Sequence, residues 1–217
     1  MKCLAVNTAN MILSLALTDG ERVLQTFESA ETRDQGNLLL RHIKEALAKE
    51  NLKFGDLNLF AVVTGPGSFT GIRIGLATMR ALSMAAKVPV VGISSFEMFT
   101  APKPGHVNLI AVESWREELY FHALDGKGAE VIPPVNVSPE EFVKKLEGMK
   151  ESFVISGDAA GKLHALLPNA RLSSHHPAAA HVAHLAVKSF HAAGRAERPL
   201  PFYLREADVT MAKSKAC

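Results

Sequence analysis

The segment TGPGSFTGIRIG at residues 64–75 decides the fold, because it joins an apolar run at residues 60–63 to the start of a helical pattern. A strand, a glycine turn and a helix N-terminus therefore meet there. Such a junction directs backbone N–H groups and the positive end of a helix dipole at one spot, which favours an anion or a closely packed backbone. The segment lacks the lysine of a P-loop and the third glycine of the dinucleotide motif. A tight turn without a ligand is the simpler interpretation.

The helix predicted after this turn, at residues 71–86, carries small residues on one face. Gly71, Gly75 and Thr78 are spaced by four and three positions, and Ala81 and Ala85 continue the row. Glycine inside a helix costs about 1 kcal/mol relative to alanine, so two of them indicate a close approach by another element. The pattern leaves open whether that element is the chain's own sheet or another protein.

Residues 65–75, GPGSFTGIRIG, resemble the signature of the bacterial TsaB (YeaZ) family, whose members are subunits of the machinery that makes threonylcarbamoyladenosine on tRNA. Three shorter segments also match the family, and they occur in the family's order along the chain: LAVNT (4–8) before the signature, and ELY (118–120) and PFYLR (201–205) after it. The resemblance covers nearly the whole chain. It implies an α/β protein with the two-lobed actin-like ATPase or sugar-kinase (ASKHA) fold, in which mixed sheets are flanked by helices.

Three positions depart from the family pattern. Asn7 stands where the family usually has aspartate, Gln35 stands where a histidine is expected, and Trp115 interrupts an Asp-Ala-Arg-like triplet. No family role is carried over to these positions. Trp115 and Arg116 follow a predicted strand, where they could stack on a base and pair with a phosphate, or could equally cap the core of a lobe.

Hydrophobic periodicity predicts a set of strands and helices that is repeated on a smaller scale in the second half of the chain. The first set comprises strands at residues 3–6, 11–17 and 23–27, a helix at 38–47, a strand at 60–63, the helix at 71–86 and a strand at 88–91. The second set comprises strands at 108–112 and 119–124, a helix at 139–146, a strand at 153–156 and a helix at 178–193. Residues 101–105, APKPG, break both patterns and serve as a linker. We therefore expect lobes at residues 1–103, with the glycine signature, and 104–217, whose C-terminal segment can pack back on the first lobe.

Composition limits the possible functions. With 217 residues and 47% hydrophobic side chains the chain can bury a substantial core, and its net charge of +2 does not favour direct nucleic-acid binding. Cys3 and Cys217 form no disulfide framework, which suits a reducing cytosol. No run approaches the roughly 18 apolar residues of a membrane span. We predict a cytoplasmic protein that does not contact membranes.

Catalytic patterns are weak. The turn Thr8-Ala9-Asn10 has no glycine that would let its backbone approach a phosphate, and Asn7 lacks the charge that a Mg²⁺ site normally supplies. A row of histidines on the last helix lacks an accompanying cysteine or HExxH motif, so a polar helix face is the simpler interpretation. We predict no catalytic residue, no metal site and no cofactor of its own. The alternative is a stand-alone nucleotide-dependent phosphotransferase of the same fold.

The resemblance implies a non-catalytic subunit of the complex that forms N6-threonylcarbamoyladenosine at position 37 of tRNAs reading codons beginning with A. Such a subunit would stabilise a TsaD-like catalytic paralogue beside a TsaE-like ATPase, with ATP and metal on those partners and tRNA reached only through the complex. A homodimer could form through the same surface. The predicted partner interface comprises Leu38, Leu39, His42, Ile43, Ala46, Gly71, Gly75, Thr78, Met79 and Leu82. The predicted structural signature comprises Gly65, Pro66, Gly67, Ser68, Phe69, Thr70, Gly71 and Arg73.

Overall fold

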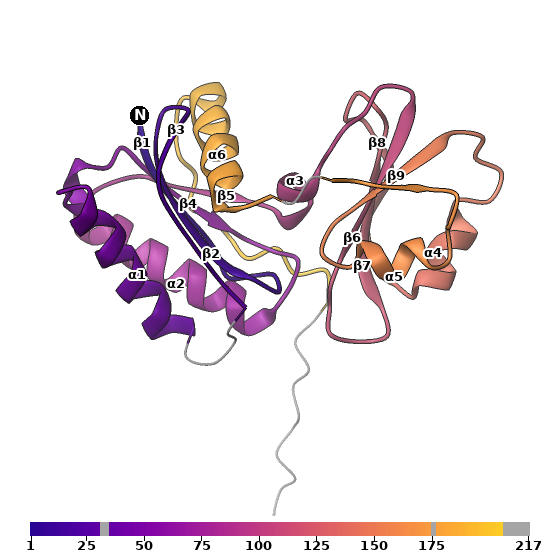
Figure 1. Cartoon of the computed structure of the whole chain (residues 1–217), viewed down its shortest axis with the longest axis horizontal. Helices are drawn as coiled ribbons and strands as arrows, with labels where there is room; N and C mark the ends of the chain where they lie inside the picture. The colour runs from indigo at the N-terminus through magenta and orange to yellow at the C-terminus, as the bar shows by residue number, and fades with distance from the viewer. Residues whose placement is uncertain (31–34, 175–176, 206–217) are drawn as a thin grey trace, which may run out of the picture.

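The computed structural model describes residues 1–30, 35–174 and 177–205, which form two lobes side by side (Figure 1). The sheet of the first lobe has the strand order β3-β2-β1-β4-β5. Its strands are β1 (Lys2–Asn7), β2 (Leu13–Asp19), β3 (Arg22–Ser29), β4 (Leu59–Val63) and β5 (Val90–Ile93). β1, β2 and β3 form an antiparallel meander, while β4 and β5 extend the sheet in parallel on the other side of β1. β4 is buried along its whole length, as expected for a central strand covered on both faces.

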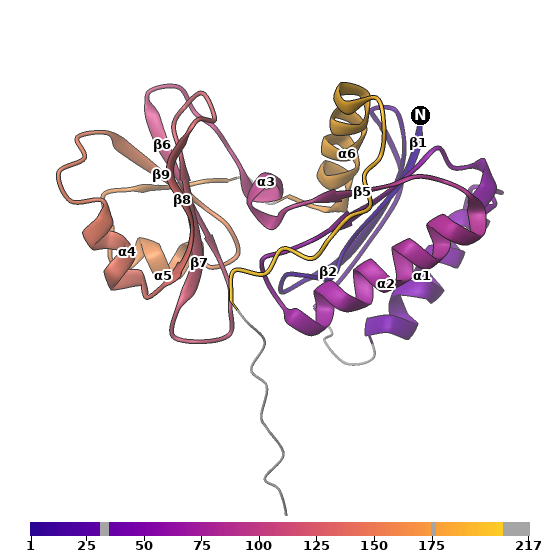
Figure 2. The same cartoon turned by 180° about the vertical axis from the view of Figure 1, so that it is seen from behind.

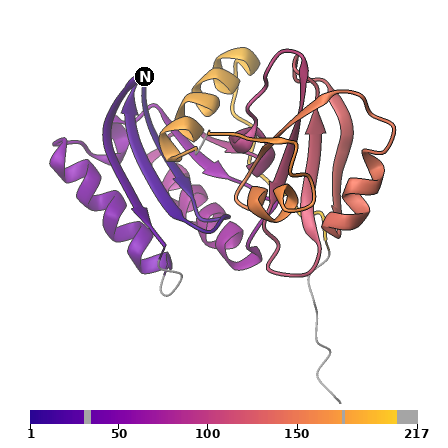
Figure 3. The same ribbon diagram turned by 45° about the vertical axis from the view of Figure 1, so that its right-hand side comes forward.

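Helices cover both faces of this sheet (Figures 1 and 3). The helices that follow its strands are α1 (Gln35–Lys49), the 3₁₀ helix η1 (Phe54–Asp56), α2 (Phe69–Ala86) and α3 (Ser95–Phe99). α1 and α2 lie side by side on one face. α2 begins at Ser68, whose Oγ accepts a 3.2 Å hydrogen bond from the Gly71 N–H, and it ends at Lys87, which has a left-handed backbone.

The second lobe repeats the sheet of the first. Its elements are β6 (His106–Val112), β7 (Leu119–Leu124), β8 (Glu130–Val137), α4 (Pro139–Lys145), β9 (Ser152–Ser156), α5 (Ala160–His164) and β10 (Arg171–Leu172). The strand order β10-β9-β6-β7-β8, read from β8, is the order of the first sheet, and parallel and antiparallel pairs fall at the same places. Phe121 and Phe142 stack in its core with centroids 4.1 Å apart. The repeat that the hydrophobic pattern suggested is present in the structure.

The last helix, α6 (Ala179–Ala193), departs from the predicted second set of elements. It packs on the first sheet, against β1, β2, β4 and β5, and its buried Val182, Ala183 and Ala186 join the first core. The reason is that α1 and α2 cover only one face of an apolar sheet, so the other face needs a helix. The second lobe proper therefore spans β6 to β10, and the chain returns to the first lobe afterwards.

The segment after α6 continues along the first lobe and runs between the lobes (Figure 2). The Phe202 N–H donates a 2.9 Å hydrogen bond to the carbonyl oxygen of Thr64, and Arg80 donates to the carbonyl oxygen of Pro199. These contacts attach the segment to the end of β4 and to the middle of α2. The end of the described chain thus lies beside the glycine signature.

Candidate functional site

The two helical glycines of the signature face the chain's own first strand. The Thr8 hydroxyl donates a 2.7 Å hydrogen bond to the Gly71 carbonyl oxygen, and a Cβ on Gly71 would overlap the Thr8 carbonyl oxygen. A Cβ on Gly75 would overlap the Thr8 hydroxyl and come within 3.3 Å of Val62. The close approach that these glycines indicated is therefore the contact of α2 with β1 and β4.

The turn before α2 is held by the first hairpin in the same way. The Ser68 N–H donates a 2.7 Å hydrogen bond to the Ala9 carbonyl oxygen, and a Cβ on Gly67 would overlap that oxygen. Gly65 has φ of 105°, and its carbonyl accepts a 2.7 Å hydrogen bond from Ser95. These are the contacts of a tight strand-to-helix turn, which position the start of α2 at the boundary between the lobes.

The predicted partner interface needs a correction at residue level. Its largely buried members pack in the first core: Leu39, Ile43, Ala46, Gly71, Gly75 and Met79. Of the two elements that the sequence left open for the glycine row, the chain's own sheet is the one that Gly71 and Gly75 contact. Leu38, His42, Thr78 and Leu82 are half-buried, and the His42 ring stacks on Phe27 with centroids 3.5 Å apart.

A different row of small residues on α2 is exposed. Ala77, Ala81 and Ala85 follow one another at intervals of four on the face away from the sheet. Met84 beside them is 81% exposed, and Leu40 on the neighbouring α1 is 38% exposed. The sequence analysis assigned Ala81 and Ala85 to the glycine row, because periodicity alone could not separate two rows of small residues that are offset by two positions.

The first hairpin turn uses its polar groups internally. Asn7 is 4% exposed, and its Oδ1 accepts a 3.0 Å hydrogen bond from the Ala9 N–H. The amide that replaces the expected aspartate therefore braces the turn. The N–H of Ala9 is thus used by Asn7, and its carbonyl oxygen accepts the hydrogen bond from Ser68.

The lobes meet at Asp158, which follows β9. Burial raises the pKa of this carboxyl, with smaller opposing effects from hydrogen bonds with the backbone of Glu113 and Met11. Its Oδ1 accepts a 2.9 Å hydrogen bond from the Glu113 N–H. The Asn10 side chain approaches Asp158, but within the described residues no hydrogen bond of normal geometry satisfies the buried Asn10 Nδ2 or Asp158 Oδ2. Polar groups of both lobes thus pack together at this point.

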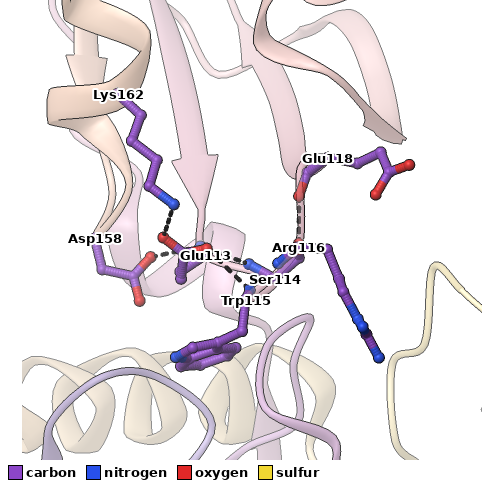
Figure 4. A network of polar contacts seen from close by, with 7 residues as sticks. All are labelled: Glu113, Ser114, Trp115, Arg116, Glu118, Asp158 and Lys162. Atoms are coloured by element: carbon purple, nitrogen blue, oxygen red, sulfur yellow. Dashed lines mark hydrogen bonds and ion pairs between the residues drawn. The ribbon is translucent and has the colours of Figure 1, made fainter.

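Glu113 organises the turn between β6 and β7 (Figure 4). It is buried, and its Oε2 lies 2.7 Å from Nζ of Lys162. Its Oε1 accepts hydrogen bonds from the N–H groups of Ser114, at 3.1 Å, and Trp115, at 2.9 Å. Ser114 Oγ in turn accepts a 3.2 Å hydrogen bond from the Arg116 N–H and donates to the Glu118 carbonyl. A single buried carboxylate therefore sets the conformation of this turn.

Trp115 is displayed by that turn rather than buried in a core. It is 49% exposed, and its φ of 58° places it in the left-handed region that a bulky residue rarely adopts. The sequence left two roles open for Trp115 and Arg116, which were binding a base and a phosphate or capping the core of a lobe. The exposure of the Trp115 side chain does not fit a residue that caps the core. Both side chains line a cavity of about 380 Å³ together with the glycine signature and the C-terminal segment.

The sequence analysis singled out the glycine signature and the Trp115-Arg116 pair, but it did not predict that they and the C-terminal segment line one pocket. Phe202, Tyr203 and Arg205 line it from the C-terminal segment, which the sequence marked only as a weak family match. The cluster of aromatic residues in this segment was the available signal. Nothing local in the sequence indicates that residue 203 lies beside residue 69.

The comparisons with known proteins decide the family. A family model described as "TsaD: tRNA N6-adenosine threonylcarbamoyltransferase" matches residues 30–189. The chain belongs to this family, on its TsaB (YeaZ) branch. "tRNA threonylcarbamoyladenosine biosynthesis protein TsaB" of Escherichia coli K12 is 34% identical over 95 residues, which are 44% of this chain and 41% of that protein. The match thus spans less than half the length of this curated relative.

Two solved structures bear on the fold. YeaZ from Pseudomonas aeruginosa superposes with a TM-score of 0.75 at 19% identity, over 94% of this chain and 99% of that one. The activator of the 2-hydroxyisocaproyl-CoA dehydratase from Clostridium difficile, solved with bound ADPNP, has a TM-score of 0.55 at 8% identity, over 89% and 97% of the two chains. At such identities the likeness concerns the fold alone, and it confirms the predicted actin-like architecture.

Among the described residues, no three His, Cys, Asp or Glu side chains converge on a point that could hold a metal ion. His181, His184 and His191 lie on α6, where His184 faces Glu21 at 3.9 Å; the neighbouring His175 and His176 fall outside the described residues. No helix in the described parts of this TsaB-like chain has the length and apolar character needed to cross a membrane.

Proposed function

We propose that this chain is a non-catalytic subunit of the cytoplasmic complex that forms N6-threonylcarbamoyladenosine at position 37 of tRNAs reading codons beginning with A. Its role is to stabilise a TsaD-like catalytic subunit, which works with a TsaE-like ATPase. The observation that carries the proposal is family membership combined with the first hairpin, where Asn7 braces the turn and the turn has no glycine. ATP and metal are then handled by the partner subunits, and tRNA is reached through the complex.

We place the docking surface for the TsaD-like subunit on the outer face of α1 and α2. The exposed alanines 77, 81 and 85 form a low ridge that a partner helix can approach closely, and Met84 and Leu40 add apolar area beside it. The two helices are those predicted from sequence, while the contact residues are the exposed ones. The same ridge offers a self-complementary surface for a homodimer when the partner is absent.

Reconstitution tests this function. The chain should co-purify with its TsaD-like partner. Purified mixtures should modify tRNA only when they contain this chain, the partner, the TsaE-like ATPase, ATP and a source of the threonylcarbamoyl group. The chain alone should modify no tRNA. Full modification by a mixture that lacks this chain, or failure of the two proteins to associate, would exclude the proposed role.

The alternative function, a stand-alone phosphotransferase, has less support. A phosphotransferase of this fold needs an acidic metal ligand and a hairpin backbone open to phosphate. Here the residue at the metal-ligand position is the uncharged Asn7, and its side chain already accepts the Ala9 N–H that could otherwise donate to a phosphate. Phosphate transfer from Mg-ATP by the isolated chain would reinstate the alternative.

A further inference from the structure

The pocket between the lobes has a composition unlike the rest of the chain. Five of its thirteen described lining residues are aromatic, although aromatic residues make up only 6% of the sequence. They include both tyrosines and the single tryptophan. Two lining residues are arginines, and none of the thirteen is acidic. Aromatic faces beside cationic side chains are typical of sites that bind a base and its phosphate.

One wall of the pocket is a fixed tyrosine. The Tyr203 ring lies 4.9 Å from the Phe69 ring, measured between centroids, and its hydroxyl accepts a 3.4 Å hydrogen bond from Nε of Arg73. The Arg73 guanidinium lies 3.8 Å from the Phe69 ring centroid. These three side chains hold one another, yet Tyr203 is still 38% exposed. A base stacking on it would therefore meet a surface that is already ordered.

The opposite wall is the turn organised by Glu113. The two hydrogen bonds that Glu113 Oε1 accepts hold the left-handed backbone at Trp115, and Lys162 fixes the carboxylate from behind. Figure 4 shows the Trp115 and Arg116 side chains projecting from this turn, while the Glu118 side chain points another way. An unfavourable conformation is thus maintained at the residue that displays the largest aromatic surface of the chain.

The charged side chains among the described lining residues of the pocket are arginines. Arg116 comes from the second lobe and Arg205 from the C-terminal segment, so cations from two separate elements face one cavity. Residues 68–70, which open the 18-residue helix α2, also line it. The dipole of this helix adds to the potential of the arginines, and its first N–H groups have no intrahelical acceptors. A phosphate fits this arrangement without a metal ion.

We propose that this pocket binds one nucleotide, with its base stacked on Trp115 or Tyr203 and its phosphate at Arg116, Arg205 and the start of α2. A cavity of about 380 Å³ accommodates a single nucleotide. The nucleotide is either free or an unpaired nucleotide of an RNA loop, because both present the same base and phosphate. The site uses neither the hairpin at Asn7 nor a metal, and it belongs to the isolated chain, so it does not depend on partner docking.

The single tryptophan provides a direct test. AMP titrated into the isolated full-length chain in the presence of EDTA should quench Trp115 fluorescence saturably, and adenosine and inorganic phosphate should each bind about tenfold more weakly or worse. An RNA hairpin with an unpaired loop that binds at least tenfold tighter than AMP, while a blunt RNA duplex does not, assigns the site to RNA. Equal or weaker binding of the hairpin assigns it to a free nucleotide.

Variants identify the pocket as the place of binding. By calorimetric titration, Trp115→Ala should lower the affinity for the tighter ligand about tenfold, and Arg116→Gln and Arg205→Gln should each lower it and flatten its salt dependence. Arg195→Gln is the matched control, because it removes an exposed arginine that pairs with Glu197 far from the pocket. Melting curves verify that each variant is folded. The proposal is overturned if AMP and the hairpin both fail to bind, or if folded pocket variants bind as well as the control.

Discussion

The hydroxyl of Thr8 donates a 2.7 Å hydrogen bond to the carbonyl oxygen of Gly71. This bond joins the end of β1 to the first turn of α2, and the Thr8 carbonyl lies where a side chain at position 71 would have to stand. The helix that starts at the lobe boundary is thereby fixed to the central strand of the sheet. The glycines of the signature act through packing within the lobe.

Gly71→Ala should destabilise the protein. The added methyl group would overlap backbone atoms of Thr8, which cannot move without shifting β1, and such overpacking costs about 1–3 kcal/mol. Urea denaturation measures the change. Gly161→Ala is the control, because a methyl group added to that helical glycine would have no atom within 4 Å of it, so its stability should stay equal or rise by up to about 1 kcal/mol. Equal stabilities of the Gly71 variant and the parent protein would contradict the packing described.

The isolated chain should have no tight, magnesium-dependent site for ATP. In the hairpin that would meet the phosphates, the Ala9 N–H is already donated to Asn7, and residues 7–12 supply no carboxylate of their own for Mg²⁺. Calorimetric titration with Mg-ATP should therefore show no magnesium-dependent binding. A magnesium-dependent dissociation constant in the low micromolar range would show that the hairpin accepts the nucleotide.

Ionisation of Asp158 should lower the stability of the protein as the pH rises between two values. These are the pKa of the Asp158 carboxyl in the unfolded state and its higher pKa in the folded state. Burial raises the folded pKa, so the native state holds its proton more tightly than the unfolded state, and unfolding becomes easier as that proton is lost. Below the unfolded pKa, about 4, both states are protonated and this cost is absent. Asp158→Asn keeps an acceptor for the Glu113 N–H and removes the ionisation.

The measurement is the unfolding free energy of parent and Asp158→Asn at a series of pH values from about 4 upward. The parent should lose stability relative to the variant over this series and then level off. Asp125→Asn should show no such change over this series, because backbone hydrogen bonds from Ala129 and Lys127 lower the pKa of the Asp125 carboxyl and its effect on stability varies with pH only below about 4. A pH-independent difference for the Asp158 variant would mean that this carboxyl has the same pKa in both states.

The sequence predicted the strands and helices that have strong hydrophobic periodicity. It did not predict elements whose formation or position depends on the rest of the fold. β8 was missed because Pro133 and Pro134 interrupt its sequence, and the structure tolerates them because β8 is an edge strand. β10 has only two residues, Arg171 and Leu172, too few for any periodicity. The position of α6 on the first sheet depends on which face α1 and α2 leave open.

The candidate site divides in the same way. The glycine signature could be found because its residues are adjacent in the sequence. The pocket could not, because it joins three segments that lie far apart along the chain, at residues 66–70, 114–120 and 202–205. Which small residues of α2 are exposed was likewise undetermined, since Gly75 and Ala77 both belong to rows with helical spacing and only the packed sheet distinguishes them.

Ala81→Trp should weaken binding to the TsaD-like subunit while the chain stays folded. Ala81 lies in the exposed row of α2, so the indole adds bulk to the proposed docking ridge and none to the core. Overpacking of a close helix contact commonly costs about 1–3 kcal/mol, which corresponds to a tenfold to hundredfold loss of affinity. Surface plasmon resonance against the purified partner measures this loss, and circular dichroism and melting curves verify the fold.

Ala192→Trp is the matched control, because it places the same side chain at an exposed position of α6, on the opposite face of the sheet. It should bind the partner as the parent protein does. Normal binding by the folded Ala81 variant would move the interface away from α2. Weakened binding by both variants would indicate that the added tryptophan acts nonspecifically. Weakened binding by the Ala81 variant alone would place the TsaD-like subunit on the alanine ridge. The glycine row would then serve only the internal contact of α2 with Thr8.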